Sequence, residues 1–454
     1  MRQMHKYRTN MRRIRIEYHD AQWPSDCHRR QLDDGIACSG VLLPQNGPQL
    51  AWFFQGSFWK GSVLQLSLVE PSVRQAISAI GSLHEYKASL LSRRSYATGV
   101  AEPDSAVRLY MRAIRAVLNK AAADASAMPI VVVACILFTF FEYLRGNVLV
   151  AASHLSSGIN FLTAWREKTG TQPQKPWGHG YLSFDSHFME TELAPVISTF
   201  NIYTSETNPG TRMKFLLNPV DAGSIILADR FDSVQEAKVA MIDMATATVG
   251  VFQLIHEKLE QGQFPTAEEF ATIAGLRHTR DHWKANFDDL VRRQESGWNQ
   301  EQCGAANILR LMWYSTIMGV TTFRMGSESA WDNHRSHFKE IVRLVESLIA
   351  GPEHYPDEFS RILNLDYDLL YPLHVVTWKC RWPMLRRKGL DILRRMPAQV
   401  WWYNVEHYYI IFSRIMHFEE AHLDYGDDIP DDATLIPKSV RVHDFYTLPY
   451  FETG

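Results

Sequence analysis

Apolar residues recur at helical spacing along most of the chain. The clearest case is the stretch 70–85, in which Pro71 suits the first turn of a helix, where its missing N–H costs nothing. One face of this stretch carries the apolar set Val73, Ala76, Ile77, Ile80 and His84. We expect a core-facing helix that starts at Pro71 and ends near His84, since the helix dipole favours a histidine at the C-terminal end.

A second stretch, 128–144, is apolar on nearly all sides. Its longest apolar run, from Met128 to Phe141, has 14 residues and is broken once, at Thr139. This run is too short to span a bilayer and predicts a buried helix. Gly146 and Asn147 then form a short polar turn before helical periodicity resumes at Val148. Two helices joined in this way form an antiparallel hairpin.

The same periodicity continues to the C-terminal part of the chain, and no segment reads convincingly as a strand. Further helices are expected over 57–68, 106–125, 233–261, 266–295, 303–325, 333–349, 369–382, 383–396 and 400–420. The pattern predicts an all-α fold, a single large array of antiparallel helix hairpins.

Charge and turn residues divide the chain into three parts. Residues 1–49 form an irregular basic lead-in with no acid before Glu17, residues 50–424 form the helical domain, and residues 425–454 form an extended acidic tail. Because the start is basic rather than apolar, it does not resemble a secretory signal.

The overall composition is that of a soluble globular protein. The chain has 454 residues, 46% of them hydrophobic, and a net charge of −3, which argues against an electrostatic grip of the whole protein on nucleic acid. The cysteines are odd in number and widely spaced: Cys27, Cys38, Cys135, Cys303 and Cys380. This spacing favours a reducing compartment, the nucleus or the cytoplasm, over a disulfide framework.

Four stretches resemble a known family in their residues and in their order along the chain. They are Phe53 to Glu85 with its Glu-Pro-Ser-Val-Arg-Gln-Ala segment, Ala134 to Asn147 continuing to Gly158, Phe338 to Leu348, and Tyr371 to Arg395. Together they resemble the fungal-specific transcription factor domain, second type, over about residues 50–445. The resemblance implies a helical regulatory region in the nucleus, often one that controls a secondary-metabolite gene cluster.

The chain departs from that family at the DNA-binding module. The family's zinc binuclear cluster needs six closely spaced cysteines, whereas only Cys27 and Cys38 lie in the N-terminal region, 11 positions apart. These residues cannot build the cluster, so we expect no metal, no cofactor and no DNA binding through it. An in-frame six-cysteine segment upstream of Met1 is an alternative that the sequence leaves open.

His374 is the main candidate for chemistry. Asp366 or Tyr367, at i−8 or i−7, would share its helix face and form an acid/base pair with it. The other residues of this candidate pocket are Arg381, Trp382 and Trp402. Trp402 belongs to a group of aromatic residues near 401–409 that are suited to line an apolar site. The competing interpretation is a core histidine with one partner inside an ordinary aromatic core.

Glu142 and Arg145 lie three positions apart at the end of the apolar helix. We interpret them as a structural charge pair rather than a catalytic one.

Two functions follow from these features. The favoured one is a transcription-factor-like regulator that acts through protein partners or a small-molecule effector, with no membrane association; homo-oligomerisation is compatible with it. The alternative is a helical scaffold recruited as an enzyme or binding protein for a secondary-metabolite intermediate. The common hydrolase, NTPase and dinucleotide-binding motifs do not occur in the sequence.

Overall fold

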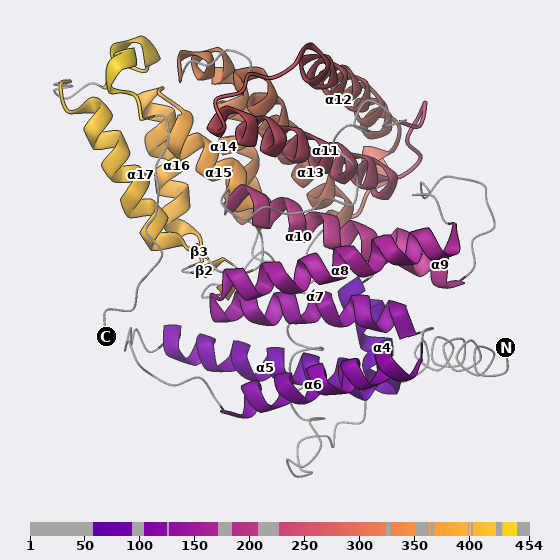
Figure 1. Cartoon of the computed structure of the whole chain (residues 1–454). Helices are drawn as coiled ribbons and strands as arrows, with labels where there is room; N and C mark the ends of the chain where they lie inside the picture. Colours follow the sequence, from indigo (N-terminus) through magenta and orange to yellow (C-terminus); the bar gives the residue numbers. More distant parts are fainter. Residues whose placement is uncertain are drawn as a thin grey trace. The chain divides into compact units, whose positions relative to one another are not determined.

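The computed structural model describes residues 58–92, 104–124, 127–170, 184–207, 227–323, 328–350, 363–364, 367–397, 399–400, 403–423 and 429–442. Within them helices pack on helices, so the prediction of an all-α fold is confirmed (Figure 1). The chain divides into two compact units, Met1–Thr272 and Ile273–Gly454. The predicted helical domain over 50–424 therefore contributes to both units.

The first unit contains eight α-helices among its described residues, with two short π-helical turns, η2 (Phe58–Ser62) and η4 (Met189–Leu193). The α-helices are α4 (Val63–Val69), α5 (Pro71–Ser92), α6 (Asp104–Ala123), α7 (Met128–Arg145), α8 (Val148–Thr169), α9 (Phe184–Phe188), α10 (Ala194–Thr207) and α11 (Val234–Glu260).

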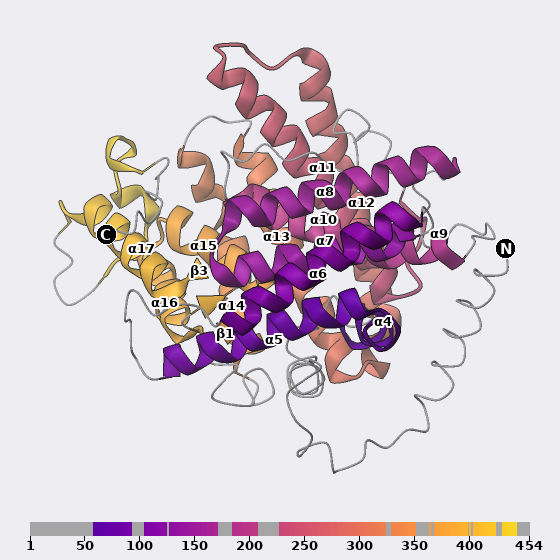
Figure 2. The ribbon, with the colours of Figure 1, turned by 60° about the horizontal axis from the view of Figure 1, so that its bottom comes forward.

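Helix α5 begins at Pro71, as predicted, but it does not end near His84. It continues to Ser92, and His84 is buried in its middle. The dipole argument for a capping histidine was therefore wrong here, because the position of His84 follows the apolar stripe and not the helix end. Helix α5 packs against α6 and α7, and Figure 2 shows α5 and α6 next to each other.

Helix α7 is the centre of the first unit, since it contacts α5, α6 and α8. This position explains why it is apolar on nearly all sides. It ends at Gly146, which takes the left-handed conformation (φ 80°) that glycine adopts without strain, and the N–H of Asn147 bonds back to the carbonyl oxygen of Glu142 at 2.9 Å. Helix α8 then returns alongside α7 as the predicted hairpin (Figure 1).

Two helices in the described part of the chain are long and apolar enough to cross a membrane by length and composition alone. They are α7, with 18 residues, and the Val234–Ile255 part of α11. In an apolar 18-residue window of each helix, 83% and 72% of the residues, respectively, are buried inside the protein, as in the core helices of a packed domain. The apolar run 128–141 is too short to span a bilayer, but α7 as a whole is long enough. Its burial, not its length, is therefore the feature typical of a core helix.

The second unit is built around α15, which contacts α13, α14, α16 and α17. Its helices are most of α12 (Ala267–Gln294), from Ile273 onward, α13 (Gln300–Phe323), α14 (Arg335–Ile349), α15 (Tyr367–Lys379), α16 (Pro383–Arg395) and α17 (Val405–Glu420), with 3-10 turns η6 (Glu295–Gly297), η7 (Glu328–His334), η8 (Ala433–Leu435) and η9 (Lys438–Val440).

A small sheet precedes α17, where a longer helix was expected. Strands β1 (Leu363–Asn364), β2 (Gln399–Val400) and β3 (Tyr403–Asn404) have two residues each and pair in the order β1-β2-β3. Helix α17 starts only at Val405 because the side chain of Asn404 accepts a hydrogen bond from the N–H of His407 and caps the helix.

The acidic tail was expected to be extended beyond residue 425. Its described part, 429–442, instead contains η8 and η9 and places the Arg441 side chain in the interior. Arg441 near the end of this segment pairs with Asp332, and the acids before it also hold the segment, since Asp431 pairs with Arg335 and Asp432 caps η8.

The close approach of α16 to α15 yields a stability prediction. A Cβ atom on Gly389 of α16 would lie 2.9 Å from Val376 Cγ1 and 3.3 Å from Thr377 Cγ2. We expect Gly389→Ala to lower the free energy of unfolding by about 1–3 kcal/mol, measured by urea denaturation. Gly275→Ala is the matched control, since no heavy atom of the described chain lies within 4 Å of its Cβ position in α12. It should raise stability by about 0.5–1 kcal/mol, and equal effects of the two substitutions would contradict the packing argument.

Candidate functional site

His374 lies in α15 and packs against aromatic side chains of α17. Its ring stacks on Tyr408 with centroids 4.9 Å apart and meets the edge of Phe412 at 5.2 Å. Only 8% of the residue is exposed, and this burial lowers its pKa from 6.5 to about 3. At neutral pH His374 is therefore an uncharged aromatic side chain within the α15–α17 interface.

The proposed partners of His374 fall largely outside the described residues. Asp366 and Trp402 lie outside them, and Tyr367 is described only as the first residue of α15, without its side chain. The acid/base pair thus stays a prediction, and the contacts that the structure gives His374 are those of the competing core interpretation.

Arg381 and Trp382 lie together between α15 and α16 but have different surroundings. Arg381 is almost fully buried and faces Glu419 of α17, with 2.7 Å between Nη2 and Oε1. Trp382 is half-buried, and the guanidinium of Arg335 lies over its ring at 4.5 Å from the centroid. Neither residue has a recorded contact with His374.

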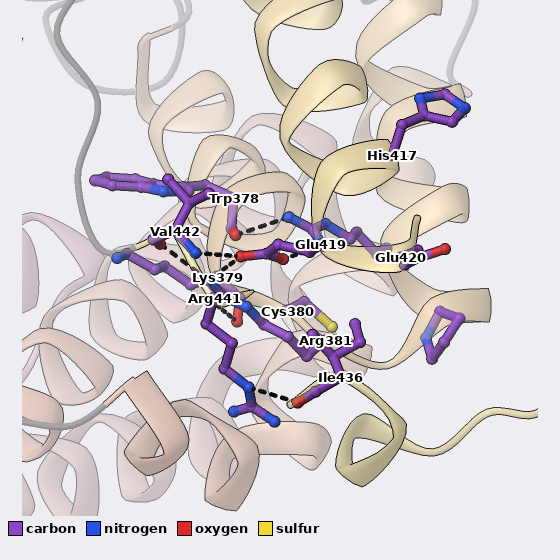
Figure 3. Close-up of polar contacts among 12 residues, drawn as sticks. Trp378, Lys379, Cys380, Arg381, His417, Glu419, Glu420, Ile436, Arg441 and Val442 are labelled. Carbon is purple, nitrogen blue, oxygen red and sulfur yellow. Dashed lines mark hydrogen bonds and ion pairs between the residues drawn. The ribbon is translucent and has the colours of Figure 1, made fainter. Parts of the chain in front are cut away.

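Glu419 is the centre of a buried ion cluster at the end of α17 (Figure 3). Its Oε1 accepts hydrogen bonds from Arg381 Nη2 and from the backbone N–H of Val442, each at 2.7 Å, and its Oε2 accepts one from Arg386 Nη1 at 2.6 Å. The side chains of Glu419, Arg381 and Arg386 are all 0% exposed. Burial alone would raise the pKa of Glu419, but the two guanidinium groups hold it below its usual value, so the carboxylate stays charged.

The same arginines satisfy the C-terminal end of α15. The last carbonyl groups of a helix have no partner inside it, and burying them unpaired is costly. Arg386 donates from Nε to Thr377 O (3.0 Å) and from Nη2 to Trp378 O (3.2 Å), and Arg381 donates from Nη1 to Lys379 O (2.8 Å). The positive charge is also favourable at this negative end of the helix dipole.

Further ion pairs extend the cluster to the 3-10 turn η7 and to the tail. Glu328 contacts Lys379 Nζ at 2.8 Å and Arg381 Nη2 at 3.0 Å. Arg441 contacts Asp332 at 2.8 Å and donates to the carbonyl oxygen of Ile436 at 3.0 Å, as Figure 3 shows for Ile436. The cluster thus joins α15, α16, α17, η7 and the tail, and its charges are directed at one another and at backbone carbonyls.

Sequence reasoning found Arg381 but missed its partners Glu419 and Glu328, and it missed Arg386, which shares Glu419 with it. A signal was present for two of them. Arg386 lies in the buried stripe of α16 that also carries Gly389, Leu390 and Leu393, and Glu419 continues the stripe Phe412, Ile415 and Met416 of α17. A charged residue on an apolar stripe marks a buried charge, because the stripe faces the core.

The pair of Glu142 and Arg145 forms in the first unit. Arg145 Nη1 lies 3.0 Å from Glu142 Oε1 at the end of α7, with Glu142 buried and Arg145 partly exposed. Beside it, Tyr110 of α6 stacks on Phe141 with centroids 4.4 Å apart, and its hydroxyl lies 2.7 Å from His154 Nε2 of α8. The pair lies within the packing of α6, α7 and α8.

No set of three or more His, Cys, Asp and Glu side chains in the described ranges is arranged to hold a metal ion. Cys27 and Cys38 lie outside the described residues.

Comparisons with known proteins give no family. No family model, no curated protein and no solved structure matches the chain.

The buried cluster generates a prediction for Glu419. Glu419→Gln removes the shared carboxylate and leaves Arg386 without any carboxylate at ion-pair distance among the described residues. We expect a loss of about 3–5 kcal/mol in the free energy of unfolding, measured by chemical denaturation. Glu340→Gln is the control, because it breaks an exposed pair with Arg343 and should change stability by less than about 0.5 kcal/mol. Similar losses in both variants would contradict a central role for Glu419.

His374 generates a pH prediction. The folded protein binds a proton at His374 only near pH 3, whereas the unfolded chain does so near 6.5. Between these values the unfolded state binds more protons, so stability falls as the pH falls. We expect His374→Phe, which keeps a stacking ring, to lose about 2 kcal/mol less stability than the wild type between about pH 7 and pH 5. His278→Phe, at an exposed position, should behave like the wild type. The idea fails if His374→Phe keeps the wild-type pH profile.

Proposed function

We propose that this protein is a transcription-factor-like regulatory module of the nucleus or cytoplasm. The cysteines of this sequence do not form the six-cysteine set of a zinc binuclear cluster. In this proposal the protein acts through partner proteins or a small-molecule effector, in connection with a secondary-metabolite gene cluster. The proposal rests on the resemblance carried by the four sequence stretches described above.

One structural observation supports it most directly. The resembling stretches contribute the packed centre of each unit: α7 contacts both α5 and α8 in the first unit, and α14, α15 and α16 contact one another in the second. The residues that resemble the family are therefore mainly core residues, as expected for a shared helical scaffold.

The chemistry of the candidate pocket also favours regulation over acid/base catalysis. His374 is neutral, buried and stacked on Tyr408, and Arg381 is bonded to Glu419 and Glu328. A general acid or base must reach the proton that it transfers, and these contacts direct both side chains toward the protein interior.

The proposal predicts a transcriptional phenotype. Deleting the gene in its native host should lower the transcripts of the associated biosynthetic genes together, along with their final product, and re-expression should restore both. The measurements are RNA sequencing and metabolite profiling of the same cultures. Unchanged transcripts with accumulation of one intermediate would reject the regulator and support the enzyme alternative.

A further inference from the structure

One buried cation in the second unit forms no ion pair with any residue that the structure describes. Helix α12 buries a stripe of side chains toward the core, consisting of Ile273, Leu276, Arg280, Trp283, Phe287 and Leu290. Arg280 occupies a position of this stripe at which helical periodicity calls for an apolar residue. It is among the largest fully buried side chains of the described residues, with 0% exposure.

The hydrogen bonds of Arg280 involve only one side of its guanidinium group. Nη1 donates to the carbonyl oxygen of Thr316 in α13 at 2.7 Å. Nε and Nη2, in contrast, have no hydrogen-bond partner in the described part of the chain. Trp313 of α13 donates from Nε1 to the backbone carbonyl oxygen of Arg280 at 3.4 Å, so α13 fixes this turn of α12 at two points.

Arg280 also differs from the other buried arginines in the counter-charges around it. Arg381, Arg386 and Arg441 each have a carboxylate within 3.0 Å, whereas Arg280 forms no ion pair with any described residue. Arg381 too has an Nε without a partner, but Glu419 and Glu328 meet its charge. Burial lowers the pKa of Arg280 to about 10, partly offset by nearby Asp281, so the group remains charged at neutral pH.

We propose that Arg280 is the recognition residue of a binding site for a small carboxylate-bearing molecule. The N–H groups of Nε and Nη2 point from the same edge of the guanidinium plane, and this fork matches the two oxygens of a carboxylate. A bidentate carboxylate would satisfy both donors and neutralise the charge together.

The surroundings favour a carboxylate over a phosphate. Trp283, the next member of the stripe, stacks on Phe287 with centroids 4.8 Å apart, so the neighbouring surface is aromatic. Burying a single negative charge beside such side chains costs less than burying a doubly charged phosphate. The inference does not depend on the proposed regulatory function, because binding is measured on the purified protein and regulation in cells.

The test is thermal unfolding and calorimetric titration of the purified full chain. The probes are sodium benzoate and sodium acetate, with benzamide as the neutral isostere of benzoate, inorganic phosphate as the competing anion class, and sodium chloride at equal ionic strength. We expect benzoate at saturation to raise Tm by about 2 °C or more. Benzamide and sodium chloride should have no such effect, and phosphate should have less effect than either carboxylate.

Three variants test whether the rise in Tm depends on the paired Nε and Nη2 donors of Arg280. Arg280→Met should abolish the Tm shift, and Arg280→Lys, which keeps the charge but not the fork, should weaken binding by about tenfold or more. Arg277→Met removes an exposed arginine of the same helix and should bind benzoate as the wild type does. Arg280→Met should fold, because it replaces a buried charge without a counter-ion by an apolar side chain of similar length; its own Tm and circular dichroism check this.

Three results would overturn the proposal. The first is no carboxylate-dependent shift in the wild type, which would leave Arg280 as a structural cation only. The second is equal benzoate binding by folded Arg280→Met, or by Arg280→Lys if the Met variant does not fold. The third is a larger shift with phosphate than with benzoate and acetate, which would assign the site to another class of anion.

Discussion

The carboxylate of Glu419, held between Arg386 and Arg381, is the interaction on which the second unit depends. The end of α15, the start of α16, the end of α17 and the residues near Val442 all meet at its two oxygens. Each arginine has two roles. It pairs with Glu419, and it donates hydrogen bonds to carbonyl groups at the end of α15 that have no partner within the helix. Removing either arginine would leave both the buried Glu419 charge and carbonyl groups at the end of α15 with fewer partners.

Such a cluster fixes geometry more than it adds net stability. Bringing charges into the interior costs free energy that their mutual attraction only partly returns, and apolar residues of equal volume often do as well. Apolar contacts, however, tolerate sliding of one helix along another, whereas the Glu419 oxygens accept only one placement of α16 and α17 relative to α15. We interpret the cluster as the device that selects this arrangement. In the first unit α7 is instead enclosed by apolar contacts and has its charge pair, Glu142 and Arg145, only at its end.

The sequence predicted the elements where the signal is local. Pro71 and Gly146 determine a helix start and a helix stop through their own backbone geometry, and the structure places both ends there. Prediction failed where a distant or competing contact decides. His84 lies inside α5 because the core, not the dipole, determines its position, and α17 starts late because Asn404 provides a better cap than Val400.

The same limit applies to the candidate site. Periodicity identifies a charged residue that faces the core, as it does for Arg386 and Arg280, but it does not identify what that residue meets there. The partner of Arg386 is 33 positions away on another helix, and only the packing of α16 on α17 brings the two together. Arg280 presents the same pattern on its stripe and has no such carboxylate among the described residues. A buried charge that other residues of the chain neutralise belongs to the fold, whereas one without a counter-charge among the described residues is the kind of group on which we base the proposed carboxylate site. This difference in counter-charge separates the structural arginines of the Glu419 cluster from Arg280.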